Sequence, residues 1–402
     1  MKIYKRRVFN QVVPFIGSET IIVLHGARQV GKSYILFYLR DWLNEKSKKV
    51  FYYDLEYPDI LEDFNKGVDI FLADLKGKGY QDGEEVFVLI DEIQYLDNPS
   101  SFLKIVADHY KSIRLIVSGS STFDIKTKFT DSLSGRITPF EVFPLSFEEF
   151  LLFKQTGYVL SKVSSPSQVA RLKELYKEFV IYGGYPRVVL ESEEEKKKAY
   201  LLQVIDTYIR KDVRDLAQVE DIRKFNNMLY VLASQSGQLL DMGSLSRETT
   251  ISFPTLQKYL TILEETYVIK LIRPYSKSPS VEISKNPKVF FYDSGLQSLL
   301  WFKNFQQTLL GNIFETNIFS ELVKRYDRHM IHFWRTKQRQ EIDFVVEKAN
   351  GVCLPIEVKT NFQRYQQGAI DSFIKKYVTR DWKVVALEGK KTSEHFVFPW
   401  EV

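Results

Sequence analysis

The sequence has few of the residues that build disulfides and zinc sites. Cys353 is the single cysteine among 402 residues, which excludes an intramolecular disulfide and a cysteine-rich zinc site. The five histidines are scattered without the spacing of metal ligands. No apolar run reaches the roughly 18 residues needed to cross a bilayer, and the N-terminal MKIYKRRVFN leads into polar sequence rather than a signal-peptide core. We therefore expect a soluble, cytoplasmic protein without a membrane partner.

What the sequence does contain is typical of a globular chain with several domains. Hydrophobic residues make up 44% of it and charged residues 27%, which suffices for buried cores. Its length predicts two to four domains. The formal net charge of +5 permits contact with nucleic acid without requiring it.

The most informative segment is IIVLHGARQVGKS, residues 21–33, which joins an apolar strand to a complete GxxxxGK[ST] phosphate loop. Gly26 and Gly31 allow the tight turn that points backbone N–H groups at a polyphosphate. Lys32 is expected to neutralise the β- and γ-phosphates, and the Ser33 hydroxyl to bind Mg²⁺. An ordinary strand–helix turn is the alternative, but the amphipathic helix that starts at Tyr34 favours the phosphate loop.

A second apolar run, Val86–Ile90, ends in Asp91 and Glu92, as expected for a parallel strand that delivers carboxylates to the edge of a sheet. Asp91 is predicted to hold Mg²⁺ through water, and Glu92 to polarise the attacking water. The alternative is a strand that ends in a solvated acidic turn. The cofactors predicted are therefore ATP and Mg²⁺. The predicted nucleotide-binding residues are Gly26, Ala27, Arg28, Gln29, Val30, Gly31, Lys32, Ser33, Tyr34 and Ser118.

Strands and helices alternate through this first module, which predicts a doubly wound parallel sheet. The expected strands are 21–25, 49–54, 86–90 and 114–118. Ser118 ends the fourth strand, where a polar side chain can sense the γ-phosphate or belong to a simple turn. Arg136 follows a helix and precedes a strand, and is a candidate arginine finger or an ordinary surface arginine.

The middle of the chain changes from a helical pattern to that of a winged helix. We expect a helical lid over 156–220, broken at YGGYP. Within 221–302, Ser252 is a plausible N-cap for a helix over 253–265, whose buried stripe is expected to contain Phe253, Leu256, Leu260 and Leu263. The wing is expected at 275–287. Such helices enter DNA grooves in many proteins, but the outward face here is poor in arginine, so contact with a protein is the alternative.

The last hundred residues contain a second set of charged residues. Glu315 lies in a predicted amphipathic helix, and the turn at 348–351 folds two strands so that Asp343 lies opposite Ile356 and Glu357. Glu357 and Lys359 are two residues apart and share one strand face. Carboxylates and a lysine so placed can bind one or two Mg²⁺ and hold a hydroxide that attacks a phosphodiester, the D…ExK arrangement of restriction-endonuclease-like nucleases. The predicted metal ligands here are Glu315, Asp343 and Glu357, and the alternative is a strand with alternating charges.

Taken in order, GARQVGKS, LIDEIQ, SGSS, SGR with PLSFEEF, YGGYP and FWR…EIDFVVE…IEVK span almost the whole chain. This ordered set resembles the prokaryotic, archaeal and bacterial, AAA+ ATP-binding proteins with a C-terminal domain of unknown function. The resemblance implies ATP binding and hydrolysis at Lys32, Ser33, Asp91 and Glu92. It also implies a nuclease-like terminal fold around Glu315, Asp343, Glu357 and Lys359.

The sequence therefore predicts an α/β multidomain protein. Its expected parts are an AAA+ core over 1–155, a helical lid over 156–220, a winged helix over 221–302 and a restriction-endonuclease-like domain over 303–402. The predicted function is a Mg²⁺-dependent ATPase that binds or processes nucleic acid, with DNA favoured; a homo-oligomer is compatible with it. The competing classes are a signalling switch whose inactive terminal domain binds DNA or protein, and a transcription regulator with ATP as ligand.

Overall fold

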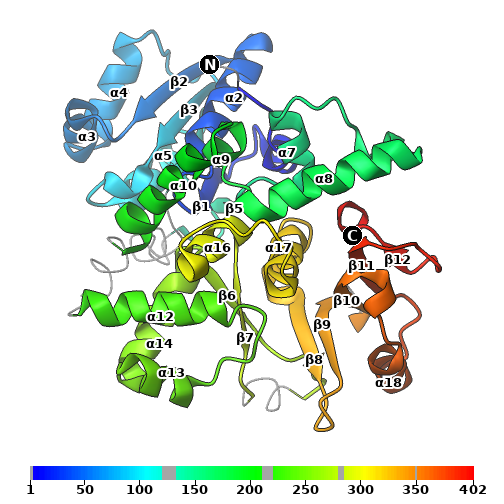
Figure 1. Cartoon of the computed structure of the whole chain (residues 1–402). Coiled ribbons are helices and arrows are strands. Elements are labelled where there is room, and N and C mark those ends of the chain that lie inside the picture. The colour runs from blue at the N-terminus through cyan, green and yellow to red at the C-terminus, as the bar shows by residue number, and fades with distance from the viewer. Residues whose placement is uncertain (1–2, 120–132, 211–220, 279–284, 349–350) are drawn as a thin grey trace. The chain divides into compact units, whose positions relative to one another are not determined.

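The computed structural model describes residues 3–119, 133–210, 221–278, 285–348 and 351–402 (Figure 1). The chain forms two compact units, Met1–Phe143 and Pro144–Val402. The lid, winged-helix and terminal segments predicted after residue 155 all lie in the second unit. Among the described helices, none combines the length and the apolar character that crossing a membrane would need.

The first unit is built on a parallel sheet with the strand order β2-β3-β4-β1-β5. Each of the predicted strands is present within one residue of its expected ends. Because all strands run the same way, their carboxyl ends meet at one edge, and β4 lies there between β3 and β1. The strands are β1 Ile21–Gly26, β2 Lys49–Asp54, β3 Val86–Asp91, β4 Ile113–Gly119 and β5 Ile137–Val142.

Helices cover both faces of this sheet, as the predicted doubly wound arrangement requires. Ile21 and Val23 of β1 join a core cluster with residues of α3, α4 and α5. Side chains alternate along a strand, so Ile22 and Leu24 point to the other face, which α2 covers. The helices are α1 Arg7–Val12, α2 Lys32–Glu45, α3 Pro58–Asn65, α4 Val68–Gly77 and α5 Pro99–His109.

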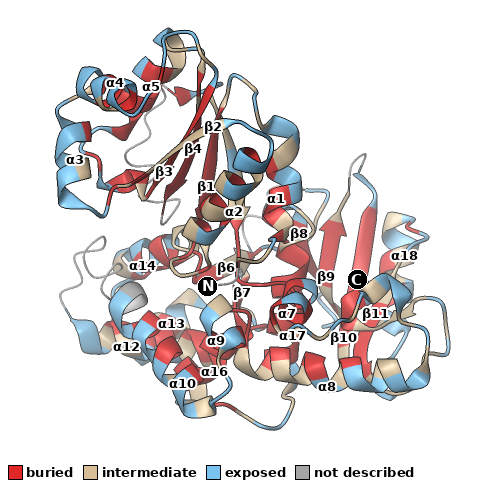
Figure 2. Ribbon diagram, turned by 90° about the horizontal axis from the view of Figure 1, so that it is seen from above, coloured by how far each residue is buried: buried red, intermediate tan, exposed pale blue. Residues whose placement is uncertain are grey.

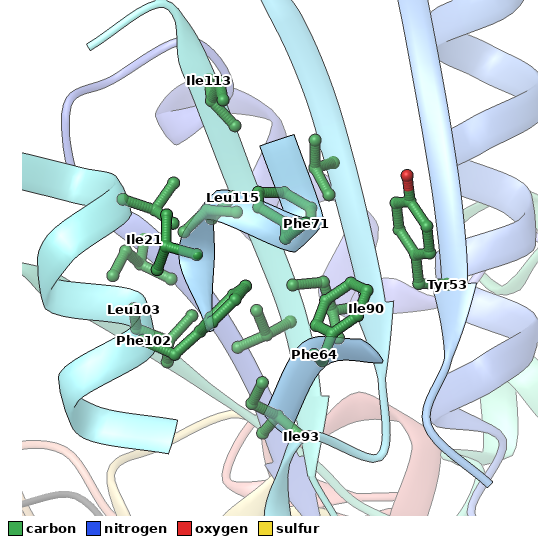
Figure 3. Packing of buried hydrophobic residues seen from close by; sticks show 14 of the residues in the cluster. Ile21, Tyr53, Phe64, Phe71, Ile90, Ile93, Phe102, Leu103, Ile113 and Leu115 are labelled. Carbon is green, nitrogen blue, oxygen red and sulfur yellow. The ribbon is translucent and has the colours of Figure 1, made fainter. Parts of the chain in front are cut away.

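Aromatic rings fill the core between the sheet and α3–α5 (Figure 3). The ring of Phe102 stacks on Phe64 with 5.2 Å between centroids and meets Phe71 edge-on at 5.2 Å. Strands β1 and β3 are buried along their whole length and appear red in Figure 2. A closely packed core of this kind holds the strand ends in fixed positions. The loops at the carboxyl edge begin at these ends.

The second unit begins with helices whose starts are set by serine caps. The Ser146 and Ser165 side chains accept hydrogen bonds from the backbone N–H groups of Glu149 and Gln168, and both form capping boxes. The predicted break at YGGYP is present, because Gly183 (φ 78°) ends one helix and Pro186 begins the next. The helices are α7 Phe147–Phe153, α8 Pro166–Tyr182, α9 Pro186–Leu190, α10 Glu194–Gln203 and the π-helix η5 Val204–Arg210.

The next segment has the helices and the antiparallel hairpin expected for 221–302. The Ser252 side chain accepts a hydrogen bond from Thr255 N–H and so caps α14, as predicted. The predicted buried stripe is wrong at Phe253, which is 47% exposed, because the first turn of α14 extends past the core that covers Leu256. Residues 279–284 of the expected wing lie outside the described residues. The elements are α12 Ile222–Ser234, α13 Met242–Thr249, α14 Phe253–Glu265, β6 Ile269–Ile272, β7 Lys288–Phe291 and α16 Ser294–Phe302.

A mixed sheet with the order β12-β11-β10-β9-β8 forms the C-terminal part. The first three strands in the chain form an antiparallel meander, and β11 then pairs parallel to β10 after helix α18. Two residues of the turn at 348–351 lie outside the described residues. The elements are α17 Gly311–Val323, β8 Ile331–Arg335, β9 Glu341–Glu347, β10 Cys353–Asn361, α18 Gly368–Tyr377, β11 Lys383–Glu388 and β12 Phe396–Val397.

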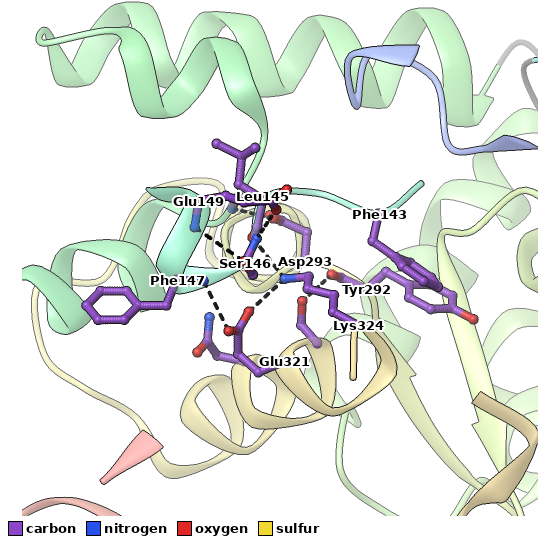
Figure 4. A network of polar contacts seen from close by, with 12 residues as sticks. Phe143, Leu145, Ser146, Phe147, Glu149, Tyr292, Asp293, Glu321 and Lys324 are labelled. Atoms are coloured by element: carbon purple, nitrogen blue, oxygen red, sulfur yellow. Dashed lines mark hydrogen bonds and ion pairs between the residues drawn. The ribbon is translucent and has the colours of Figure 1, made fainter. Parts of the chain in front are cut away.

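Helix α17 is buried nearly all round rather than on one face, because it packs against α8, α16, β7 and β10. Its polar residues are paired there (Figure 4). Glu321 accepts a hydrogen bond from Phe147 N–H at 3.0 Å, and Lys324 pairs with Glu321 at 2.8 Å and donates to Leu145 O at 2.9 Å. Buried charges need such partners, so this network ties α17 to the start of α7.

A close approach between α16 and the end of α8 predicts a strong stability effect. A Cβ on Gly295 would overlap with the backbone carbonyl of Tyr182. We expect Gly295→Ala to lower the free energy of unfolding by about 1–3 kcal/mol or more, since backbone must shift to admit the methyl group. Gly311→Ala, at an open position of α17, is the matched control and should be neutral or slightly stabilising. Equal denaturation midpoints for the two variants would contradict this close approach.

Candidate nucleotide and acid–lysine sites

The phosphate loop follows β1 and leads into α2. A Cβ on Gly26 would overlap with the Val142 carbonyl, so only glycine fits there. Gly31, with φ at 94°, takes the left-handed conformation just before α2 begins. Lys32 is 5% exposed, and its Nζ donates to the Ala27 carbonyl at 2.8 Å and the Gly26 carbonyl at 3.3 Å. The loop therefore curls around the lysine ammonium, and Ser33 follows it in the first turn of α2.

Asp91 lies at the carboxyl end of β3, held by donors from neighbouring strands. Its carboxylate accepts hydrogen bonds from the hydroxyl groups of Ser118, on β4, and Tyr52, on β2, the latter at 3.1 Å. Burial and the negative charge of Asp91 raise the pKa of Tyr52 well above its usual range, so the phenol stays a donor. The predicted neighbours Asp91 and Ser118 are thus brought into contact.

Glu92 follows in a left-handed conformation, with φ at 55°. Its backbone N–H lies 3.1 Å from Asp91 Oδ1 and 3.3 Å from Ser118 Oγ, and its carboxylate accepts a hydrogen bond from the Gln94 amide. A glutamate is uncommon in the left-handed backbone conformation, and the surrounding structure holds it there. The turn therefore fixes where the Glu92 carboxylate points.

Three residues at this edge were not predicted from the sequence: Tyr52, Glu56 and Gln94. Burial, and then the charge of Glu92, raise the pKa of the Glu56 carboxyl, while Arg28 opposes the shift. The sequence signal for Tyr52 is its place near the end of a strand that pairs with β3. Nothing local distinguishes Glu56 or Gln94 from other polar residues of a turn.

Arg136 lies at the opposite end of the sheet from Lys32. Its carbonyl accepts a hydrogen bond from Ile21 N–H, at the first residue of β1, whereas the phosphate loop follows the last. Roughly 17 Å of strand separates the two ends. The guanidinium instead holds Asp108 of α5 through two contacts of 2.8 and 3.2 Å, which lowers the pKa of that carboxyl. The role predicted for Arg136 therefore requires a second copy of the chain.

We expect Arg136→Ala to lower ATP turnover at least ~100-fold with ATP affinity retained, if the arginine completes a neighbouring copy's site. Turnover per subunit in the wild type should then rise with protein concentration. Asp108→Asn is the matched control, because it removes the ion pair and keeps the arginine. Concentration-independent, wild-type turnover in Arg136→Ala would make Arg136 an ordinary surface arginine that pairs with Asp108.

In the second unit, the terminal residues meet as the sequence predicted. The pairing of β9 with β10 ends with Phe344 opposite Ile356, and the next residues along the two strands are Asp343 and Glu357. Asp343 accepts a hydrogen bond from Val358 N–H at 2.7 Å. Lys359 Nζ lies 2.6 Å from Glu357 Oε1 and 3.8 Å from Asp343 Oδ2. The two carboxylates and the lysine therefore form one contiguous site.

Burial changes the protonation of the carboxyl groups in this site. It raises the pKa of Glu357 to about 7, where the charge of Asp343 adds to the effect and Lys359 opposes it. The pKa of Glu315, on α17, rises to about 8 for the same reason, with Lys288 opposing the shift. Glu357 is 8% exposed, and its Oε2 has no hydrogen-bond partner within the described structure.

In this second site the sequence analysis missed Lys288. It begins β7, is 2% exposed, and its Nζ lies 2.6 Å from Glu341 and 3.4 Å from Glu315. The only sequence signal is a charge at the head of an apolar strand, KVFF. Arg335 also pairs with Glu341, at 3.1 Å. The carboxylates beside Asp343 are thus paired with positively charged side chains of the protein itself.

The two sites differ in how they fit a metal ion. Near the phosphate loop, the Ser33 hydroxyl and the Asp91 carboxylate are oxygen donors of the kind Mg²⁺ prefers. In the terminal site, the carboxylates form ion pairs with lysine ammonium groups. Across the described residues, no three Asp, Glu, His or Cys side chains are grouped so that they could hold a metal ion. The ligand set of Glu315, Asp343 and Glu357 stays a prediction; in this structure its carboxylates lie beside the ammonium groups of Lys288 and Lys359.

Comparison with family models divides the chain into three matched regions. Residues 18–151 match an AAA domain, 173–307 match a domain of unknown function (DUF8612), and 310–397 match another (DUF4143). Together with the parallel sheet and the phosphate loop, the first match defines an AAA-type P-loop ATPase domain. The C-terminal region, which contains the site of Asp343, Glu357 and Lys359, matches a model described as a domain of unknown function.

Similar proteins occur in bacteria and archaea. An uncharacterised protein of Haemophilus influenzae is 26% identical over 411 residues, covering 94% of this chain and 98% of its own. One of Methanocaldococcus jannaschii is also 26% identical, over 90% of this chain and 78% of its own. Among solved structures, a replication initiator DnaA bound to AMPPCP and single-stranded DNA shares 16% identity, at a TM-score of 0.32, over 66% of this chain and 90% of its own. A likeness this distant says nothing about what the chain binds.

Proposed function

We propose that the first unit binds and hydrolyses ATP with Mg²⁺. The observation that carries this is the contact of Lys32 Nζ with the loop carbonyls of Gly26 and Ala27, because it places a buried ammonium inside a loop of backbone N–H groups. Phosphate oxygens would replace the carbonyls as partners of Lys32. Bound Mg²⁺ would supply charge neutralisation at the phosphates, held by Ser33 and, through water, by Asp91.

In the same site, Glu92 has the role of polarising the attacking water. Gln94 donates to its carboxylate and Ser118 lies against its N–H group, so both act as positioning residues. In this role the carboxylate accepts the proton of the attacking water. Ser118 also fixes Asp91, which links the metal-binding side chain to the water-polarising one.

We further propose that the second unit acts on nucleic acid through a nuclease-like terminal domain, with ATP turnover controlling it. The support is the contiguity of Asp343, Glu357 and Lys359 at the centre of a mixed sheet, between α17 and α18. Segment 221–302 is proposed to be a winged helix, from its three helices and hairpin, and to help position the substrate.

One observation favours a second function, in which the terminal domain binds without cleaving. The carboxylates of the site form ion pairs with Lys288, Lys359 and Arg335. The protein itself therefore offsets their negative charge. A site of this kind can serve as a switch that binds nucleic acid or a protein partner. The two functions share the ATPase and differ in whether a phosphodiester is cut.

ATP turnover measured with and without nucleic acid tests the common part. We expect single-stranded, duplex or branched substrate to raise turnover at least about twofold, with an affinity that falls steeply with salt concentration. The control is turnover by the protein with ATP and without nucleic acid, measured at each salt concentration. Turnover unchanged by every substrate, with no salt-dependent binding, would exclude nucleic acid and leave a protein as the partner.

A further inference from the structure

Two adjacent tyrosines of β2 each donate a hydrogen bond to a carboxylate, on opposite faces of the sheet. The Tyr53 ring packs in the core between the sheet and α3–α5, and its hydroxyl donates to Asp74 of α4 at 2.6 Å. Side chains alternate along a strand, so Tyr52 points to the other face, which α2 covers. There its hydroxyl donates to Asp91 Oδ2 at 3.1 Å. Of the two tyrosines, Tyr52 is therefore the one that contacts the candidate nucleotide site.

Hydrogen bonds from the protein use most of the acceptor capacity of Asp91. Within the described structure, Oδ1 accepts from the Ser118 hydroxyl and, at 3.1 Å, from the Glu92 N–H group, and Oδ2 accepts from Tyr52. An ionised carboxylate offers about four acceptor positions. The position that remains lies on Oδ2, the oxygen that Tyr52 holds. This oxygen is thus the one left to accept a hydrogen bond from a water of Mg²⁺.

The ring of Tyr52 also contacts the helix that carries Ser33. It lies against the ring of Phe37 on α2, with 5.1 Å between the two centroids. Phe37 follows Ser33 by four residues, so the two lie on the same side of the helix, one turn apart. One side chain thus contacts both elements that carry the proposed Mg²⁺ donors. Its hydroxyl contacts Asp91 on β3, and its ring contacts α2.

We propose that Tyr52 is a positioning residue of the nucleotide site, which orients Asp91 Oδ2 relative to Ser33 so that both serve the Mg²⁺ of a bound nucleotide. This inference rests on the proposed ATP-binding function of the first unit. Mg²⁺ demands near-ideal octahedral geometry, so a nucleotide with Mg²⁺ binds more weakly when the Asp91 carboxylate is free to turn. A nucleotide without metal does not use Asp91, and its affinity is independent of Tyr52.

Calorimetry with AMPPCP, a non-hydrolysable ATP analogue, tests this role without measuring turnover. In the wild type, we expect AMPPCP to bind more tightly in Mg²⁺ than in EDTA. Tyr52→Phe should lower this enhancement at least ~3-fold and leave the affinity in EDTA unchanged, because a hydrogen bond to a charged group is lost while the ring is kept. Tyr53→Phe is the matched control, since it removes the neighbouring hydroxyl on the opposite face. Its enhancement should equal that of the wild type.

Phe37→Leu keeps the test decisive if Tyr52→Phe does not fold. It removes the ring that packs against Tyr52 and keeps the Tyr52 hydroxyl. We expect the Mg²⁺ enhancement to fall at least ~2-fold, because residues in contact are energetically coupled. An unchanged enhancement in this variant would overturn the part of the proposal that concerns the ring.

The remaining outcomes separate the role of Tyr52 from the proposed function. An enhancement in Tyr52→Phe equal to that of the wild type would overturn the positioning role and leave the proposed function intact. Equal weakening in Mg²⁺ and in EDTA would also overturn it, since a general loss of structure lowers both affinities. A wild type that does not bind AMPPCP, or binds it equally with and without Mg²⁺, would overturn the proposed Mg²⁺-dependent function itself.

Discussion

Lys32→Ala should lose ATP turnover by about 10²–10³-fold and bind ATP more weakly, because it removes the ammonium held inside the phosphate loop. Glu92→Gln should behave differently. The amide keeps the shape of the side chain but cannot take a proton, so we expect ATP binding near normal and turnover lower by about 10²–10⁴-fold. Calorimetry with ATP and a phosphate-release assay separate the two effects.

Lys66→Ala is the control for this pair, since Lys66 is an exposed lysine of the same unit that pairs only with surface carboxylates. Its turnover and ATP affinity should match the wild type. If Lys32→Ala and Glu92→Gln lost ATP binding to the same extent, the division between phosphate binding and water activation would be refuted.

Asp343→Asn and Glu357→Ala should each remove nucleic-acid cleavage, by at least ~100-fold, in assays that contain Mg²⁺ or Mn²⁺. The reason is that the two carboxylates and Lys359 form one site, in which each residue positions the others. ATP turnover should stay within about twofold, since the substituted residues belong to the second unit and the phosphate loop belongs to the first. Affinity for nucleic acid should persist or rise, because one negative charge near the phosphate backbone is lost.

Glu347→Gln is the matched control for these variants, because it removes a carboxylate at the other end of β9, 3.8 Å from His332. It should leave cleavage unchanged. A wild-type protein that cuts no single-stranded, duplex or branched substrate, yet binds nucleic acid with a strong salt dependence, would exclude the nuclease and support the binding function.

The sequence determined those features that depend on neighbouring residues. Apolar runs of three to five residues specify β1–β4, and the order of Gly26, Gly31, Lys32 and Ser33 specifies the turn that follows β1, because backbone conformation and short-range pairing decide both. The alternation of side chains on β10 likewise placed Glu357 and Lys359 together. The Ser252 cap was predictable because its hydrogen bond spans three residues.

The tertiary structure decided which distant elements meet. The strand order put Arg136 and Lys32 at opposite ends of one sheet, which no local pattern encodes. Phe253 extends past the core although its spacing fits the buried stripe, because burial depends on what packs opposite. Lys288 and Glu315 are 27 residues apart, and they meet because β7 and α17 pack together. Pairing of buried charges is a property of the folded interior, so only the structure could reveal it.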